Sequence, residues 1–137
     1  MSVDFVLRTI GVVRSSVIDR KNAPRQGYEG APEASVEVAT EFLPGLDGIR
    51  AGDDVVLLTW LHEGRRDVLE VRPRKDPRNP LTGVFATRSP DRPNPIGLHR
   101  VTVTSVDGTR LGVRPLEVID GTPVVDIKPV LEQSNDG

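Results

Sequence analysis

The sequence has 137 residues, no cysteine and a formal net charge of −2. That length fits one domain, which can bury a core without disulfides or metals. The absence of cysteine excludes disulfide scaffolds, thiolate zinc sites and cysteine nucleophiles. No apolar run approaches the roughly 20 residues that span a bilayer. Residues 1–4 do not resemble a secretory signal, so we expect a cytoplasmic protein without membrane association.

The basic residues are concentrated in one part of the chain. From Arg72 to Arg100 there are seven basic and two acidic residues, so this segment carries +5 and the rest −7. A basic segment on an acidic body predicts one local anionic ligand rather than a general nucleic-acid coat. A solvated arginine-rich loop is the alternative explanation.

Thirteen glycines and twelve prolines divide the sequence into short pieces, which disfavours long helices. The apolar patterning predicts strands, in chain order, at 5–14, 36–42, 55–61, 68–71, 98–106, 111–118 and 124–127. The third is continuously apolar, which is typical of a fully buried strand. Asp-Gly pairs at 107–108 and 120–121 predict hairpin turns. This spacing predicts a mainly β, mostly antiparallel barrel or sandwich.

The remaining segments are connections and ends. Residues 17–35 and 73–83 form long connections, and unstructured loops of that length are usually functional or disordered. Residues 45–51 have room for one helical turn. We expect one domain over residues 1–131 and a disordered tail at 132–137. A strand followed by G-x-G-x-x-G and a helix is absent, which argues against a Rossmann enzyme.

The densest motif is GVFATRSPDRPNPIGL, from Gly83 to Leu98. We expect a short apolar strand that opens into a loop stiffened by three prolines, outside any strand ladder. Arg88 and Arg92 are four residues apart, so both can face one anionic group, and their planar guanidinium suits carboxylate or phosphate. The alternative is that these arginines tie the loop to carboxylates such as Asp91 or Asp126.

A second motif runs from Asp120 to Pro129. Asp126 and Lys128 fall on one face of the predicted strand, with Val125 and Ile127 on the other. Charged residues at alternate positions of an apolar strand face water, pair with each other or line a cavity. An Asp–Lys ion pair therefore explains the pattern as well as a functional role does.

Two weaker features complete the set. Residues 23–27 place a cation and an amide in a loop framed by proline and glycine. His62 and Glu63 directly follow the apolar strand that ends at Trp60-Leu61. Only two histidines are present, so we expect no histidine-rich metal site. A histidine at a strand end is more often a hydrogen-bonded structural residue than a catalytic one.

Together these four segments resemble the TrmO (TsaA-like) family of S-adenosylmethionine-dependent tRNA N6-threonylcarbamoyladenosine methyltransferases. The resemblance extends from residues 10–15 to Lys128-Pro129. It implies a small β-barrel that binds S-adenosylmethionine, as a homodimer with the ligand near the subunit interface. It also implies that the cofactor contacts are Pro24, Arg25, Gln26, His62, Glu63, Arg88, Leu98, Glu117, Val118, Ile119 and Asp120.

The implied reaction methylates N6 of threonylcarbamoyladenosine at position 37 of tRNA. Its main requirement is to hold the acceptor nitrogen in line with the sulfonium. Asp126 and His62 are the candidates for a base that removes the proton from nitrogen. Arg88, Arg92 and Lys128 are the candidates for holding tRNA phosphates or the threonyl carboxylate.

Two other functions fit the same sequence. A methyltransferase for a smaller acceptor is suggested by the acidic balance and by the chain ending soon after Leu131, where many family members continue. A noncatalytic S-adenosylmethionine-binding domain is suggested by the lack of an unambiguous base.

Overall fold

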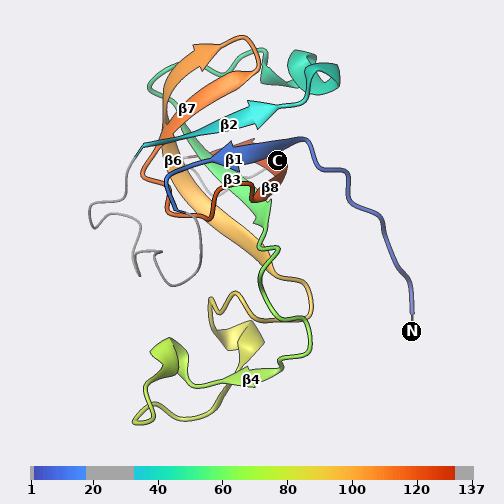
Figure 1. The fold of residues 1–137 in the computed structure, drawn as a ribbon, viewed down its shortest axis with the longest axis vertical. Coiled ribbons are helices and arrows are strands. Elements are labelled where there is room, and N and C mark those ends of the chain that lie inside the picture. The colour runs from blue at the N-terminus through green and yellow to red at the C-terminus, as the bar shows by residue number, and fades with distance from the viewer. Residues whose placement is uncertain (1, 18–32, 132–137) are drawn as a thin grey trace.

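The computed structural model describes residues 2–17 and 33–131. Six antiparallel strands close into a barrel in the order β1-β2-β7-β6-β3-β8 (Figure 1). The predicted mainly β barrel is confirmed, and a sandwich is excluded because the sheet closes on itself. The strand bounds are β1 Gly11–Arg14, β2 Ala34–Val38, β3 Asp54–Trp60, β6 Ile96–Asp107, β7 Arg110–Arg114 and β8 Pro123–Pro129.

The core fills the barrel with small and medium apolar side chains. On β3, Val55, Leu57 and Thr59 are buried, whereas the residues between them are only partly buried. The predicted fully buried strand is therefore wrong for one of its faces, because only alternate side chains of a barrel strand point inward. The other strands contribute Val13, Val36, Val101, Val103, Leu111, Val113 and Val124, each at most 1% exposed.

A small lobe, formed by residues 61–95, connects β3 to β6 and projects from one end of the barrel (Figure 1). It contains a two-stranded sheet of β4 (Glu70–Val71) and β5 (Thr82–Gly83). It also contains two 3-10 helices, η3 (Pro73–Lys75) and η4 (Val84–Ala86). The predicted loop at 73–83 thus has secondary structure of its own, and the short strand expected before Thr87 is instead a 3-10 turn.

Several predicted boundaries are wrong. The first strand begins at Gly11 rather than residue 5. Just before it, the Ile10 N–H donates to the Val124 carbonyl of β8 at 2.9 Å, whereas residues 2–9 belong to no strand. The second ends at Val38, because the chain then turns into η2 (Thr40–Leu46), from which Phe42 packs against the core. This helix replaces the turn expected at 45–51. The strand expected to reach residue 118 ends at Arg114, where Pro115 lacks the N–H that pairing requires.

The two Asp-Gly turns have different outcomes. Asp107 pairs with Arg110 across a two-residue β6–β7 loop, and Gly108 has φ 58°, so this predicted hairpin is confirmed. Gly121 also has positive φ, at 85°, yet no hairpin forms there. β7 already has β2 and β6 as neighbours, so β8 pairs with β1 and β3 instead.

Antiparallel pairing fixes which connections meet. The β1–β2, β3–β6 and β7–β8 connections all emerge from one end of the barrel, which we call the lobe end because residues 61–95 lie there (Figure 1). The β2–β3 connection and the β6–β7 hairpin lie at the opposite end.

Candidate functional site

The predicted cofactor residues belong to the lobe end. His62 and Glu63 follow β3, Arg88 precedes β6, and Leu98 lies near the start of β6. Residues 117–120 belong to the β7–β8 connection. Pro24, Arg25 and Gln26 lie outside the described residues, in the β1–β2 connection that leaves the same end. The fold thus gathers segments that are far apart in sequence, although it does not test which of them contact a cofactor.

The turn at His62–Glu63 packs directly on the proline-rich loop. The Leu61 N–H donates to the Pro95 carbonyl at 2.8 Å, and the Gly64 N–H donates to the Leu61 carbonyl at 2.8 Å. A Cβ on Gly64 would clash with the carbonyl oxygen of Pro90 and lie 3.0 Å from Cβ of Pro95. Glycine is therefore required for this close approach.

Arg92 holds the loop together from inside. Its Nε donates to the Ser89 carbonyl at 2.8 Å, and its Nη2 donates to the carbonyls of Thr87, at 2.5 Å, and of Val84. The alternative prediction was that this arginine ties the loop to carboxylates. The structure shows such a tie, but its acceptors are main-chain carbonyls. A role for Arg92 toward substrate stays a prediction.

Arg66 is a second brace of the loop, and the sequence did not reveal it. Its Nε donates to the Pro93 carbonyl at 2.7 Å, and its Nη2 donates to Oδ1 of Asn94 at 3.1 Å. Its guanidinium lies 5.1 Å from the ring centroid of Trp60, a cation–π contact. Trp60 at the end of β3 indicated that an aromatic contact could form there. Which residue contacts it depends on the path of the lobe.

Arg88 differs from Arg66 and Arg92. It is exposed, and it makes no hydrogen bond or ion pair with another described residue. The arginines of the nearby lobe are mostly engaged. Arg65 pairs with Asp67 at 3.0 Å, and Arg78 pairs with Asp76 at 2.7 Å, which lowers the pKa of both carboxyls. Arg88 thus has no partner among the described residues, and its predicted role toward an anionic ligand stays a prediction.

The turn at residues 117–120 is fastened to the chain that follows β1. The Ser15 N–H donates to Oδ1 of Asp120 at 3.1 Å, and Oγ of Ser15 donates to the Val118 carbonyl at 2.7 Å. The Asp120 N–H donates to the Val17 carbonyl at 2.6 Å. The structure therefore holds this turn beside the start of the connection that contains residues 24–26.

Asp126 lies on the outer face of the barrel, in one row with Leu58 and Leu98 of adjacent strands. Its Oδ2 is 3.6 Å from Nζ of Lys128, and its Oδ1 accepts the N–H of Ile127 at 2.9 Å. The predicted shared face of Asp126 and Lys128 is confirmed, and so is the ion pair. Since both oxygens are engaged, the role of Asp126 as a base stays a prediction.

His99 is a hydrogen-bonded residue of the barrel that the sequence did not single out. It is partly buried, and its Nε2 lies 2.8 Å from Oγ1 of the buried Thr59. Burial lowers the pKa of His99 to about 4, so the ring is neutral at physiological pH. Its burial could have been predicted, because His99 lies two residues before the inward-facing Val101 and alternate strand residues share a face.

Two further features are absent from residues 2–17 and 33–131. Within them, no three acidic or histidine side chains cluster so that they could hold a metal ion. None of the helices there has the length and apolarity that a membrane crossing requires.

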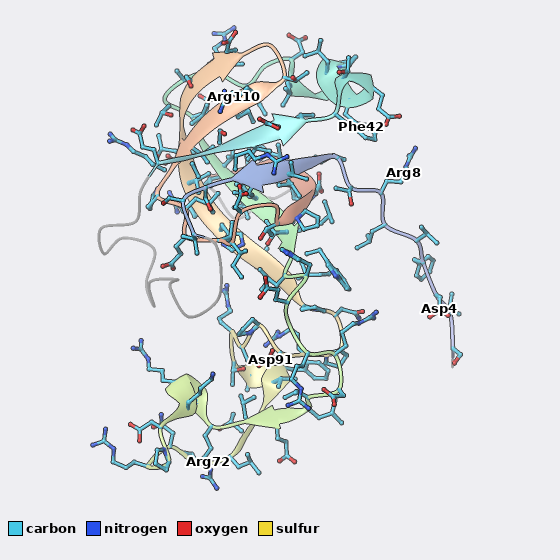
Figure 2. The ribbon with its side chains drawn as sticks, in the orientation of Figure 1. Asp4, Arg8, Phe42, Arg72, Asp91 and Arg110 are labelled. Carbon is cyan, nitrogen blue, oxygen red and sulfur yellow. The ribbon has the colours of Figure 1, made fainter. Side chains whose placement is uncertain are left out.

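The fold and the placement of these segments define a class: a closed antiparallel β-barrel whose loops at one end hold the candidate site (Figure 1). Figure 2 places Asp91 and Arg72 in the lobe at this end. The sequence matches the family described as the tRNA-methyltransferase O N-terminal domain over residues 12–136. The chain belongs to this family, which confirms the resemblance seen in the motifs.

Two relatives have closely similar sequences. A "Probable S-adenosyl-L-methionine-binding protein" of Methanothermobacter thermautotrophicus is 42% identical over 130 residues, which cover 95% of this chain and 93% of that protein. The "Probable S-adenosyl-L-methionine-binding protein VirR" of Rhizobium radiobacter is 39% identical over 126 residues, covering 92% and 71%. The expected cofactor agrees with both names.

Solved structures give the same fold. A crystal structure of TrmO matches with a TM-score of 0.78 and 31% sequence identity. The match covers 98% of this chain and 61% of the TrmO chain. This chain therefore spans about three fifths of the length of that solved protein.

Proposed function

We propose that the protein binds S-adenosylmethionine at the lobe end and transfers its methyl group to N6 of threonylcarbamoyladenosine 37 in tRNA. The observation that carries the proposal is the convergence of the described predicted cofactor segments on one barrel end, in a chain of the tRNA-methyltransferase O N-terminal domain family. Membership of the family supports a methyltransferase. That its acceptor is tRNA is the additional part of the proposal.

The side chains at this end fit the chemistry of the cofactor. Leu98 is 52% exposed and offers an apolar surface to the adenine. The exposed Arg88 guanidinium suits the methionine carboxylate. Asp120 and Glu117 are acceptors for its ammonium group, and the bond from Ser15 to Asp120 fixes the direction of that carboxylate. When bound, S-adenosylmethionine supplies a methyl group on a sulfonium.

The protein's part in the reaction is mainly to position the acceptor. The braced loop at 87–95 limits the motion of residues around the site, which reduces the entropy lost when the acceptor is aligned. We propose His62 or Asp126 as the group that accepts the proton from the acceptor nitrogen. Lys128, Arg88 and Arg92 remain our candidates for the phosphates or threonyl carboxylate of the substrate.

The direct test is transfer of a labelled methyl group. Threonylcarbamoylated tRNA incubated with the protein and methyl-labelled S-adenosylmethionine is expected to gain label, which nuclease digestion then places on the modified adenosine. The same tRNA without the threonylcarbamoyl group serves as the control. Failure to label the modified tRNA, while an active enzyme labels it in parallel, contradicts the proposal.

A second candidate is binding of the cofactor with a different acceptor or with none. It is favoured by the relatives' printed names, which mention S-adenosylmethionine binding only, and by the 61% coverage of the TrmO chain. Calorimetry distinguishes the candidates, because this one predicts binding of S-adenosylmethionine without binding of tRNA.

We also propose that the protein is a cytoplasmic homodimer, as the family resemblance implies. Light scattering is expected to give twice the 14.9 kDa chain mass. A mass of one chain, at concentrations where the cofactor binds, contradicts the dimer.

A further inference from the structure

Phe85 is an exposed aromatic side chain on the most tightly braced part of the lobe. Its side chain is 82% exposed, whereas the preceding Val84 is 1% exposed. None of the roles considered above uses it. A large aromatic ring held exposed on an ordered turn offers a partner a flat apolar face.

The backbone on both sides of Phe85 is held in place. The Val84 N–H donates to the Leu69 carbonyl at 2.9 Å. The Val84 carbonyl in turn accepts the Thr87 N–H and the Thr87 hydroxyl, each at 3.0 Å, and Arg92. The ring is therefore carried on a preorganised turn, so that a partner stacking on it orders little additional chain.

The surroundings favour an anionic and aromatic partner. The lobe of residues 61–95 contains eight Lys and Arg and five Asp and Glu, a net charge of +3, whereas the rest of the chain carries −5. Arg88, three residues after Phe85, is exposed and unpaired with any described residue. A fixed aromatic face on the same short segment as the exposed Arg88 matches single-stranded RNA, whose bases stack on aromatic rings and whose phosphates bind arginine.

We infer that Phe85 is a substrate-positioning residue on which an unpaired base of the acceptor RNA stacks. The inference rests on the proposed tRNA acceptor and gives the lobe a role in binding it. The ring contributes an apolar face to one base, and contact with the cofactor or with a second copy of this chain is the competing role that the test below separates from it.

The test compares Phe85→Leu, which keeps an apolar side chain without an aromatic face, with Phe85→Trp, which restores the face. The probe is a fluorescent anticodon stem–loop RNA carrying threonylcarbamoyladenosine, titrated with the full chain. Phe85→Leu is expected to weaken binding about 5-fold or more, the range of base–aromatic stacking. Phe85→Trp is expected to bind within about 3-fold of the original protein, a difference smaller than the loss of one stacked base.

Leu69→Ala is the matched control, since Leu69 is 64% exposed on the same lobe. It is expected to leave RNA binding unchanged. In turnover assays Phe85→Leu is expected to raise KM for tRNA more than it lowers kcat, and to leave the Kd for S-adenosylmethionine unchanged. Equal RNA binding by Phe85→Leu and the original protein overturns the inference. Phe85→Leu that raises the Kd for the cofactor without changing RNA binding also overturns the inference, and so does a change in oligomeric mass. Either result would assign Phe85 to another partner.

The same assays separate this inference from the proposed function. Phe85-dependent RNA binding without methyl transfer supports the inference and contradicts the function. Methyl transfer that is indifferent to Phe85→Leu supports the function and contradicts the inference.

Discussion

Oγ1 of Thr59 and Nε2 of His99 lie 2.8 Å apart, between the adjacent strands β3 and β6. Burial holds the pKa of His99 at about 4, below its ordinary value of 6.5, so the neutral ring belongs to the folded state. Protonation then favours the unfolded chain. The stabilisation is complete above about pH 6.5, is lost as pH falls from there to about 4, and levels off below.

The first prediction follows from that linkage. His99→Gln keeps a hydrogen-bonding side chain without a titrating ring, so its free energy of unfolding should fall less steeply between pH 6.5 and 4. The difference in slope is up to about 1.4 kcal/mol per pH unit, with a total near 3 kcal/mol. Urea denaturation at a series of pH values measures it. Parallel pH profiles for the two proteins contradict the assignment to His99.

A second prediction concerns Gly97, which faces the same pair. A Cβ there would lie 2.6 Å from Oγ1 of Thr59 and 2.7 Å from Nε2 of His99. Gly97→Ala is therefore expected to separate the pair and destabilise the protein by about 1–3 kcal/mol. Gly83→Ala is the control, because a Cβ at Gly83 meets nothing within 4 Å and its φ is −61°. Thermal unfolding should show a lower Tm for Gly97→Ala alone.

Arg92 supports a third prediction. Lysine keeps the charge but cannot reproduce the planar donation to three carbonyls, so Arg92→Lys should lower the free energy of unfolding by about 2 kcal/mol. Arg88→Lys serves as the stability control, since Arg88 has no partner among the described residues. Chemical denaturation measures both. If the two variants are equally stable, the bonds of Arg92 contribute little.

Gly64 links the lobe to cofactor affinity. Gly64→Ala forces the His62–Glu63 turn away from the Pro90 carbonyl, which is main chain and cannot rotate aside. If both segments contact S-adenosylmethionine, their separation should weaken its binding by about tenfold, or about 1.4 kcal/mol. Calorimetry gives the Kd, with Gly83→Ala again as the control. Unchanged affinity would mean that at most one of the two segments binds the cofactor.

The proposed base can be identified by isosteric substitution. Asp126→Asn and His62→Gln each remove one candidate, and loss of the true base should lower kcat by about 10²- to 10⁴-fold while leaving the Kd for the cofactor unchanged. Lys128→Met breaks the 3.6 Å ion pair but keeps the Asp126 carboxylate, so it should leave kcat unchanged, whereas a substrate-binding role of Lys128 would appear as a raised KM for tRNA. Full activity in both isosteric variants would indicate that the nitrogen loses its proton to water.

Local pattern was sufficient for part of the fold. The alternation around Val101 and Val103 predicts inward and outward faces correctly, and the Asp-Gly pair at 107–108 predicts the β6–β7 hairpin. Both depend on neighbouring residues and on backbone preferences. The same reasoning fails at Asp120-Gly121 and at residues 5–9, because whether a strand-like segment is paired depends on which neighbouring strands the barrel leaves available.

The sequence by itself determined the β-rich class, the family resemblance and the residue types available for binding, because these follow from composition, periodicity and motif. Only the tertiary structure decided how those residues are used. Arg66, Arg88 and Arg92 have the same chemistry, yet two brace the proline-rich loop and Arg88 has no partner among the described residues. That division depends on which carbonyls the fold brings within reach of each guanidinium, and such distances arise only after segments distant in sequence have packed together.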